Sequence, residues 1–215
     1  MWRILSLWLL LAALPADLAA SPWPREAGTW FGTLSLGNER RGSDWRPVGE
    51  AWVEHGLRPR LTLSAKLRHD GTGTGGEARM RWHPTVLGPG VPVGLSLGAG
   101  TVDGRGELLA GAYVGHSFRL ARGEGWARLD LDIRQLTGGG GRTTGEVALQ
   151  TGLRPGDGWI AILGARRQSG GSAHTTVTSA FGRELSPTST LLGEVAIRQG
   201  ARSPHALSMI LWQRF

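Results

Sequence analysis

Apolar and polar residues alternate along most of the chain after about residue 28. The cleanest example is 61–68, where leucine or alanine at each odd position is followed by Thr62, Ser64, Lys66 and Arg68. A period of two residues is typical of β-strands with one apolar and one polar face. Such segments recur between short turns and glycine-rich connections. They predict about twelve strands (range ten to twelve), at about 29–37, 48–57, 61–68, 77–83, 91–101, 107–118, 127–134, 146–153, 159–167, 175–183, 191–198 and 207–215.

The expected strand lengths suit a bilayer. A tilted strand of about 9 to 12 residues can cross the hydrocarbon layer, and lipid cannot satisfy the backbone groups of an open sheet edge. A membrane-spanning version of this chain must therefore be a closed barrel. An even number of strands places both chain ends on one side, which we expect to be the periplasmic side. A soluble, exported β-domain is the alternative.

The last strand carries a specific resemblance. Its outer row is Leu207, Met209, Leu211 and Phe215, interrupted only by Gln213. This closely resembles the C-terminal strand of bacterial outer-membrane β-barrel proteins, in which a terminal phenylalanine after alternating apolar residues is read by the assembly machinery. The resemblance implies an all-β, antiparallel up-and-down transmembrane barrel. It also implies a bilayer with lipopolysaccharide, the assembly machinery and periplasmic chaperones as partners. No narrower family is indicated.

The first twenty residues predict export. Arg3 precedes an apolar run from Ile4 to Leu14, and small residues follow. The run is too short for a transmembrane helix and is typical of a secretory signal peptide, with cleavage expected after Ala20. This leaves 21–215 as one barrel domain in the outer membrane of a Gram-negative bacterium. An uncleaved N-terminal anchor helix is the alternative.

Composition adds few constraints. The chain has no cysteine, which excludes disulfides and thiol chemistry, and its net charge is +7. Because the chain carries an export signal, we do not expect a nucleic acid partner. Arginines near the expected external strand ends suit lipopolysaccharide phosphates, because the guanidinium group matches phosphate geometry, although ordinary solvated charge is equally compatible. These arginines are Arg40, Arg41, Arg46, Arg142, Arg167 and Arg202.

The polar faces predict a charged lumen. In an outer-membrane barrel the apolar face contacts lipid and the polar face lines the interior. So many ionised groups require water or paired networks. The expected lumen-lining charges are Glu54, Lys66, Arg68, Arg79, Arg81, Arg128, Asp130, Asp132, Arg134, Glu146, Glu194 and Arg198. Aromatic residues near the expected periplasmic strand ends predict an interfacial girdle: Trp30, Trp82, Phe118, Trp126, Trp159, Phe181, Trp212 and Phe215.

Candidate chemistry is weak. The segment 94–98 matches the G-x-S-x-G pattern, but that motif needs a strand–turn–helix context and here lies within an expected strand. The six histidines fall near strand ends, where an amphipathic ring is expected. A lipid hydrolase could pair His205 with Ser208 or His69 with Ser64, and no third member is indicated. No metal-ligand spacing is present, and we expect no cofactor.

Two functional classes follow from these patterns. The first is a narrow, porin-like passive channel for ions or small solutes, with a slight excess of cations in its lumen. The second is a barrel without an open pore, acting as an interfacial lipid-modifying enzyme or as a structural or binding protein. We expect a protein that is not an enzyme.

Overall fold

The protein is described by a computed structural model over residues 24–70, 73–84, 91–121, 123–138, 141–170, 173–200 and 205–215. The expected signal peptide, 1–20, lies outside these ranges. Within them the chain forms twelve strands. Their bounds are β1 (Trp30–Arg41), β2 (Asp44–Arg58), β3 (Leu61–His69), β4 (Thr74–Trp82), β5 (Val93–Val102), β6 (Arg105–Leu120), β7 (Gly123–Leu136), β8 (Thr143–Gly156), β9 (Trp159–Ser169), β10 (His174–Ser186), β11 (Ser189–Gln199) and β12 (His205–Arg214). The predicted strand number is confirmed.

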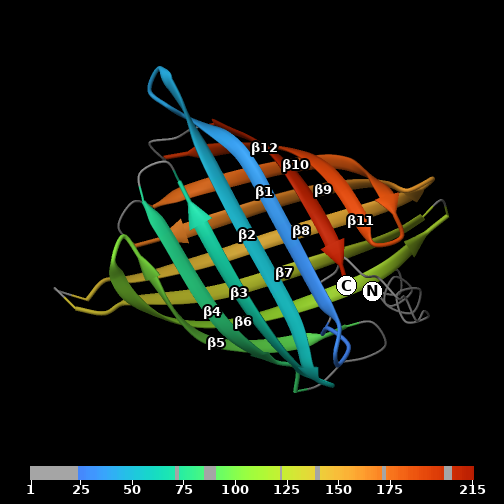
Figure 1. Ribbon diagram of the computed structural model, residues 1–215, viewed down its shortest axis with the longest axis horizontal. Coiled ribbons are helices and arrows are strands. Elements are labelled where there is room, and N and C mark those ends of the chain that lie inside the picture. The colour runs from blue at the N-terminus through green and yellow to red at the C-terminus, as the bar shows by residue number, and fades with distance from the viewer. Residues whose placement is uncertain are drawn as a thin grey trace, which may run out of the picture.

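The strands form one closed antiparallel barrel in which every strand pairs with its neighbours in sequence. Closure is between β1 and β12, which lie side by side in Figure 1 and pair from Phe31 opposite Arg214 to Arg40 opposite His205. The predicted up-and-down barrel is therefore confirmed. No helix in the described residues is long and apolar enough to cross a membrane.

The two ends of the barrel differ in what they carry. We call the end that holds the start of β1 and the finish of β12 the terminal end, and the other the opposite end. The first hairpin projects beyond its neighbouring strands at the opposite end (Figure 1). The expected strands at 29–37 and 48–57 are too short, because β1 and β2 stay paired as far as Arg41 and Asp44 and are joined by a two-residue turn. The charged residues of 38–41 continue the strand, because Glu39 and Arg41 lie on its inward face and pair with each other.

Turn chemistry explains two other hairpins. Asp103 and Gly104 both have positive φ (50° and 75°), as do Asp157 and Gly158 (53° and 73°). Two consecutive residues with positive φ are typical of the type I′ turn, whose twist matches that of paired strands, and Asp-Gly is a preferred sequence for it. The similar segments 56–59 and 152–155 coincide with register shifts at the ends of β2 and β8, between Gly56 and Arg58 and between Leu153 and Gly156.

The faces of the barrel are the reverse of those of a water-soluble protein. Outward leucines are widely exposed, including Leu97 (69%) and Leu67 (64%), whereas the intervening Ser96 and Ser64 are buried. A soluble β-sandwich would bury its leucine rows between two sheets. Here they cover the outside of a single closed sheet, which is the arrangement that lipid requires. We therefore reject the soluble alternative.

Candidate functional site

The candidate site is the barrel lumen, and its most charged part lies over β4 to β7. The inward face of β5 consists of Gly94, Ser96, Gly98 and Gly100, so this strand projects almost nothing into the interior. A Cβ atom at Gly98 would clash with the carbonyl oxygen of Ala78 and the side chain of Arg79. The G-x-S-x-G match is therefore a smooth wall segment, and its buried serine is not held in an exposed turn as a nucleophile would be.

Long arginines of β4 lie across this smooth segment and reach carboxylates of β7. Arg79 bonds to Asp132, three strands away, and its Nε donates to Glu77 Oε1 at 3.0 Å. Arg134 in turn contacts Glu77 at 2.7 Å and Glu107 at 3.1 Å, and Lys66 Nζ lies 3.7 Å from Glu77. The carboxylate of Glu77 therefore joins three cations. Pairing of this kind offsets the cost of holding charges on a partly buried wall.

A second group of charges surrounds aromatic rings. Arg81 bonds to Glu54 and lies 5.0 Å from the centre of the Trp52 ring. Arg128 pairs with Asp130 at 2.5 Å and lies 4.4 Å from the centre of the Tyr113 ring. Cation–π contacts of this kind stabilise a guanidinium that has given up part of its hydration. The sequence analysis gave neither Trp52 nor Tyr113 a role.

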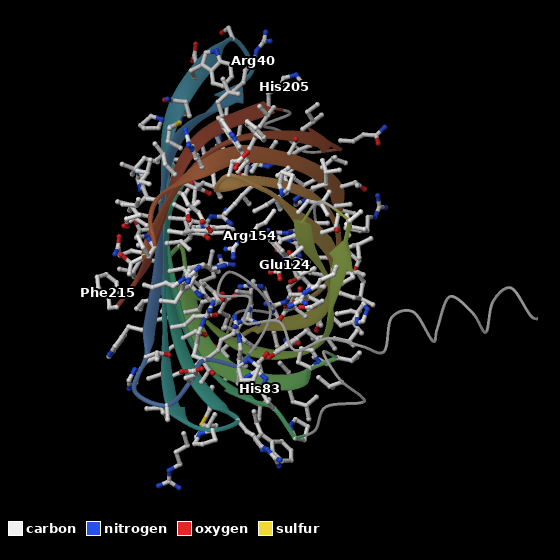
Figure 2. All side chains as sticks on the ribbon, turned by 90° about the vertical axis from the view of Figure 1, so that its right-hand side faces the viewer. Arg40, His83, Glu124, Arg154, His205 and Phe215 are labelled. Atoms are coloured by element: carbon white, nitrogen blue, oxygen red, sulfur yellow. The ribbon has the colours of Figure 1, made fainter. Side chains whose placement is uncertain are left out.

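His83 also faces the lumen, where it is labelled in Figure 2. Its Nδ1 lies 2.5 Å from Tyr113 Oη, and the residue is 4% exposed. The predicted interfacial position of His83 was therefore wrong. The alternation of β4 continues past Trp82, which carries His83 to the same inward face as Arg81.

The remaining predicted charges lie towards the opposite end. Arg198 contacts Glu39 at 2.7 Å, Arg41 contacts the same carboxylate, and Arg166 lies 3.4 Å from Glu146. Glu194 interacts electrostatically with Arg166 and Arg198. Arg68 contacts Asp70 at 3.3 Å at the rim, with its side chain 59% exposed.

The wall formed by β7 and β9 to β12 carries an apolar cluster near the terminal end. Its buried members are Trp126, Ile160, Ile162, Ala180 and Leu192, with Ile210 and Trp212 packed against them. Trp126 and Trp212 therefore do not belong to the lipid-facing girdle in which we placed them. The signal was present in the uninterrupted apolar run 159–163, since a strand that is apolar on both faces must bury an apolar row inside the barrel.

The outward aromatics remain compatible with a girdle. Trp30, Trp82, Phe181 and Phe215 are all about half exposed or more, and Figure 2 shows Phe215 outside the ring of strands. Trp159 stacks on Phe181 at 4.9 Å, with Arg183 5.4 Å from the Trp159 ring centre. An aromatic ring beside an arginine is typical of a membrane–water interface.

Residues before β1 enter the terminal end of the lumen. Arg25 Nε contacts Glu54 at 2.6 Å, its backbone N–H donates to Thr62 Oγ1 at 3.3 Å, and its guanidinium lies 4.2 Å from the Phe31 ring centre. Gly56 permits this path, because a Cβ there would clash with the carbonyl oxygen of Glu26. We call residues 24–29 the N-terminal strap. Sequence reasoning gave it no role.

Part of the lumen is not filled by side chains. Gln150 lies on the inward face of β8, opposite Arg128 and Gly164, and is exposed. Arg166, also inward, has 57% of its side-chain surface accessible. Barrels of about eight strands are usually filled by side chains, and those of about 16 to 18 hold a water-filled channel. This twelve-stranded barrel lies between these sizes, and its lumen has a packed wall and an accessible wall.

The hydrolase pairs do not form. His69 contacts Thr74 at 3.3 Å on the outward face of β3, whereas Ser64 is buried on the inward face and bonds to Arg79 O. His205 and Ser208 are three residues apart on β12, so they too lie on opposite faces. Among the described residues, no group of three or more His, Asp or Glu side chains could hold a metal ion.

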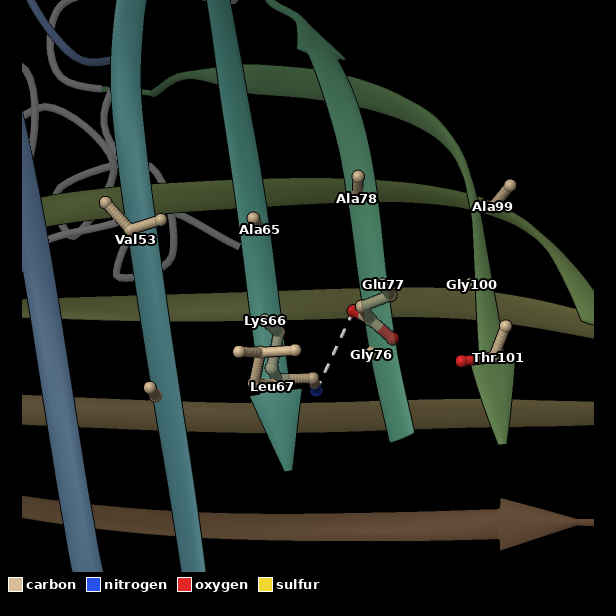
Figure 3. Close-up of a pocket in the computed structure, with 11 residues that line it drawn as sticks. Val53, Ala65, Lys66, Leu67, Gly76, Glu77, Ala78, Ala99, Gly100 and Thr101 are labelled. Carbon is tan, nitrogen blue, oxygen red and sulfur yellow. Dashed lines mark ion pairs between the residues drawn. The ribbon is translucent and has the colours of Figure 1, made fainter. Parts of the chain in front are cut away.

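A hollow of about 590 Å³ lies on the outside of the wall (Figure 3). Small or apolar outward residues line it, among them Val53, Ala65, Ala78 and Ala99, which are aligned across β2 to β5. It shares the outward leucine face, so acyl chains rather than a solute would fill it.

Some of the arginines expected to meet lipopolysaccharide do face outward. Arg167 donates to Thr175 Oγ1 at 2.8 Å near the opposite end, and Arg40 donates to the Gly42 carbonyl. Arg41 instead turns to Glu39 and Asp70. Arg202 lies outside the described residues.

Comparison with known proteins identifies the architecture. No protein-family model matches the chain, and no curated protein does. Among solved structures, the KdgM porin is similar (TM-score 0.65, 8% identity, 85% of this chain and 99% of that one), and it was also solved in complex with disordered oligogalacturonate. An outer-membrane channel from Pseudomonas putida F1 (TM-score 0.62, 13% identity, 94% and 100%) and the NanC porin (TM-score 0.62, 10% identity, 84% and 97%) are also similar. With its closed twelve-stranded sheet and outward leucine face, this chain has the fold of a bacterial outer-membrane β-barrel.

Proposed function

We propose that the protein is a narrow passive channel of the outer membrane, with a weak preference for small anionic solutes. The observation that carries this proposal is the accessible charged wall inside the closed barrel. Arg166 and Gln150 face inward and remain accessible, which supports a water-filled path beside β8 and β9. The structural similarity to porins supports a channel, and a carboxylate-bearing solute is of the class named for one of them.

The anion preference rests on which partner of each lumen ion pair is the more exposed. Side chains of Glu77 and Glu39 are 4% and 5% exposed, whereas their partners Arg134 and Arg198 are 27% and 28% exposed. In these two pairs, and in Arg166–Glu146, the carboxylate lies against the wall and the longer arginine extends from it into the lumen. In Arg79–Asp132, Arg128–Asp130 and Arg154–Glu184 the carboxylate is the more exposed partner, so the excess of exposed positive charge along the lumen is small. Such a field raises the local concentration of anions.

Single-channel recording in planar bilayers tests this function. We expect small conductance steps, and a reversal potential in a KCl gradient that indicates anion preference. Arg166→Glu should shift that potential towards cation preference, because the Arg166 side chain is 57% exposed inside the barrel, about twice as much as those of Arg134 and Arg198. Arg183→Gln is the matched control, since Arg183 stacks on the outward Trp159. Folded protein that inserts without any steps would contradict the proposal and favour a closed barrel.

The biological setting is part of the same proposal. A leader cleaved after Ala20, delivery by periplasmic chaperones and recognition of the Phe215 strand by the assembly machinery would place the barrel in the outer membrane of a Gram-negative bacterium. Outward arginines such as Arg167 would then meet lipopolysaccharide phosphates. Membrane fractionation combined with heat-modifiable migration on a gel tests the location, and protein in the soluble fraction would contradict it.

A further inference from the structure

A group of N–H donors at the terminal end of the lumen has no acceptor in the protein. Arg154 has two buried nitrogens, Nε and Nη2, without a hydrogen-bond partner, and the indole Nε1 of Trp126 is likewise buried and unpaired. The nearest carboxylate oxygen to Arg154 is that of Glu184, at 3.6 Å, which is an ion pair but too long for a hydrogen bond. Other lumen arginines, such as Arg79 and Arg134, donate to carboxylates.

The fold gathers these donors on one wall. Trp126 of β7 is opposite Gly152 of β8, and the absence of a side chain at Gly152 lets the indole lie across β8. Arg154 follows two residues later on the same inward face, and Figure 2 shows it inside the ring of strands. Arg214, on the inward face of β12, interacts electrostatically with Arg154, Glu184 and Arg25. Three cations therefore converge on this end, together with the carboxylates of Glu184 and of Glu124, which is opposite Arg154 on β7 and contacts Arg119 at 3.3 Å.

The surroundings make unpaired donors costly. The indole of Trp126 belongs to the apolar cluster with Ile160 and Leu192, both of which are almost fully buried. A buried donor without an acceptor loses its hydration and gains nothing in return, at a cost of about 1 to 3 kcal/mol, and more when it is charged. Glu184 offsets part of the charge, since it lies beside Arg154, but it leaves the N–H groups without an acceptor.

We propose that this group is a binding site for a small oxyanion, of the phosphate or carboxylate class, at the terminal end of the lumen. The planar guanidinium of Arg154 would donate hydrogen bonds to two oxygens of the anion, and the Trp126 indole N–H would donate to another accepting site on the anion. Arg214 would add positive charge. This proposal rests on the proposed channel function, because a solute reaches the site only through the lumen. It adds to that function the class of solute that binds at the terminal end.

Nuclear magnetic resonance of the folded barrel in detergent micelles tests the site. With ¹⁵N-labelled tryptophan, the indole resonance of Trp126 is assigned from Trp126→Phe, and inorganic phosphate, acetate and chloride are titrated at equal ionic strength. Phosphate and acetate should move this resonance in a saturable way, and chloride should not. Arg154→Gln should weaken the phosphate effect by about tenfold or more, because it removes charge-assisted hydrogen bonds. Arg154→Lys should weaken it less.

The controls separate a site from a general effect of charge. Arg183→Gln removes a cation from the outer surface of the same barrel end and should leave the titration unchanged. Heat-modifiable migration on a gel verifies that each variant is folded, and Arg214→Gln gives a second measure if Arg154→Gln does not fold. A Trp126 resonance that responds to phosphate no more than to chloride, or that responds equally in Arg154→Gln, overturns the proposal.

The two measurements, made on the same protein, distinguish failure of the anion site from failure of the channel. Saturable phosphate binding in a barrel that gives no conductance steps would refute the channel and leave the anion site standing. Conductance steps together with a silent Trp126 resonance would refute the site and leave the channel standing.

Discussion

Two adjacent residues of β1 test whether the outward face meets lipid. Leu36 points outward, is 58% exposed, and lies opposite Met209 of β12. Its neighbour Ser35 points inward and lies opposite Glu50 of β2. An arginine can therefore be placed at the same depth on either face of one strand, and the two variants differ only in which medium receives the charge.

The expected energies differ in magnitude. Leu36→Arg should lower the free energy of unfolding by about 2 to 4 kcal/mol, the cost of an arginine on the lipid face near the bilayer midplane. Ser35→Arg should change it by no more than about 1 kcal/mol, because the new guanidinium faces the Glu50 carboxylate in a polar lumen. On a water-exposed surface, replacing an exposed leucine would change stability by only about 0.5 kcal/mol in either direction.

The assay is urea unfolding in phospholipid vesicles, followed by tryptophan fluorescence and by heat-modifiable migration on a gel. Wild-type protein and both variants are compared in the same lipid. Equal stabilities for Leu36→Arg and wild type, or a larger loss in Ser35→Arg than in Leu36→Arg, would refute the assignment of the faces. Every conclusion about a charged lumen would then fail with it.

Three further predictions concern packing inside the barrel. Gly98→Ala should destabilise the barrel by about 1 to 3 kcal/mol, because the added methyl clashes with Arg79. Gly193→Ala should not destabilise it, because no neighbouring atom lies closer than 3.9 Å to the added methyl. Urea unfolding in vesicles compares the two variants. Ile160→Ala should lower the free energy of unfolding by about 2 to 5 kcal/mol, because it opens a cavity in the apolar cluster. Leu163→Ala on the lipid face should lower it less, because acyl chains fill the gap. A larger loss in Leu163→Ala than in Ile160→Ala, by the same unfolding measurement, would contradict this prediction. Arg25→Ala should release the N-terminal strap from Glu54 and increase single-channel conductance, and an unchanged conductance would show that the strap does not narrow the path.

Sequence periodicity predicted which face of each strand an ionised side chain occupies. Because successive residues on a strand point to opposite sides, the parity of a position places Arg79, Arg81 and Asp132 together on the inward face without any coordinates. The same parity also separates His69 from Ser64, and applying it more strictly would have removed that hydrolase pair from consideration. Strand number was accessible for the same reason, since turns interrupt the alternation.

Which inward groups meet was decided only by the tertiary structure. Arg79 reaches Asp132 across two intervening strands because the inward face of β5 is glycine and serine, and Arg198 meets Glu39 only because β12 closes onto β1. Sequence fixes local alternation, but partners in a lumen depend on the register and stagger with which the sheet closes. For the same reason the unpaired donors of Arg154 and Trp126 become visible only once distant strands have been brought to one wall.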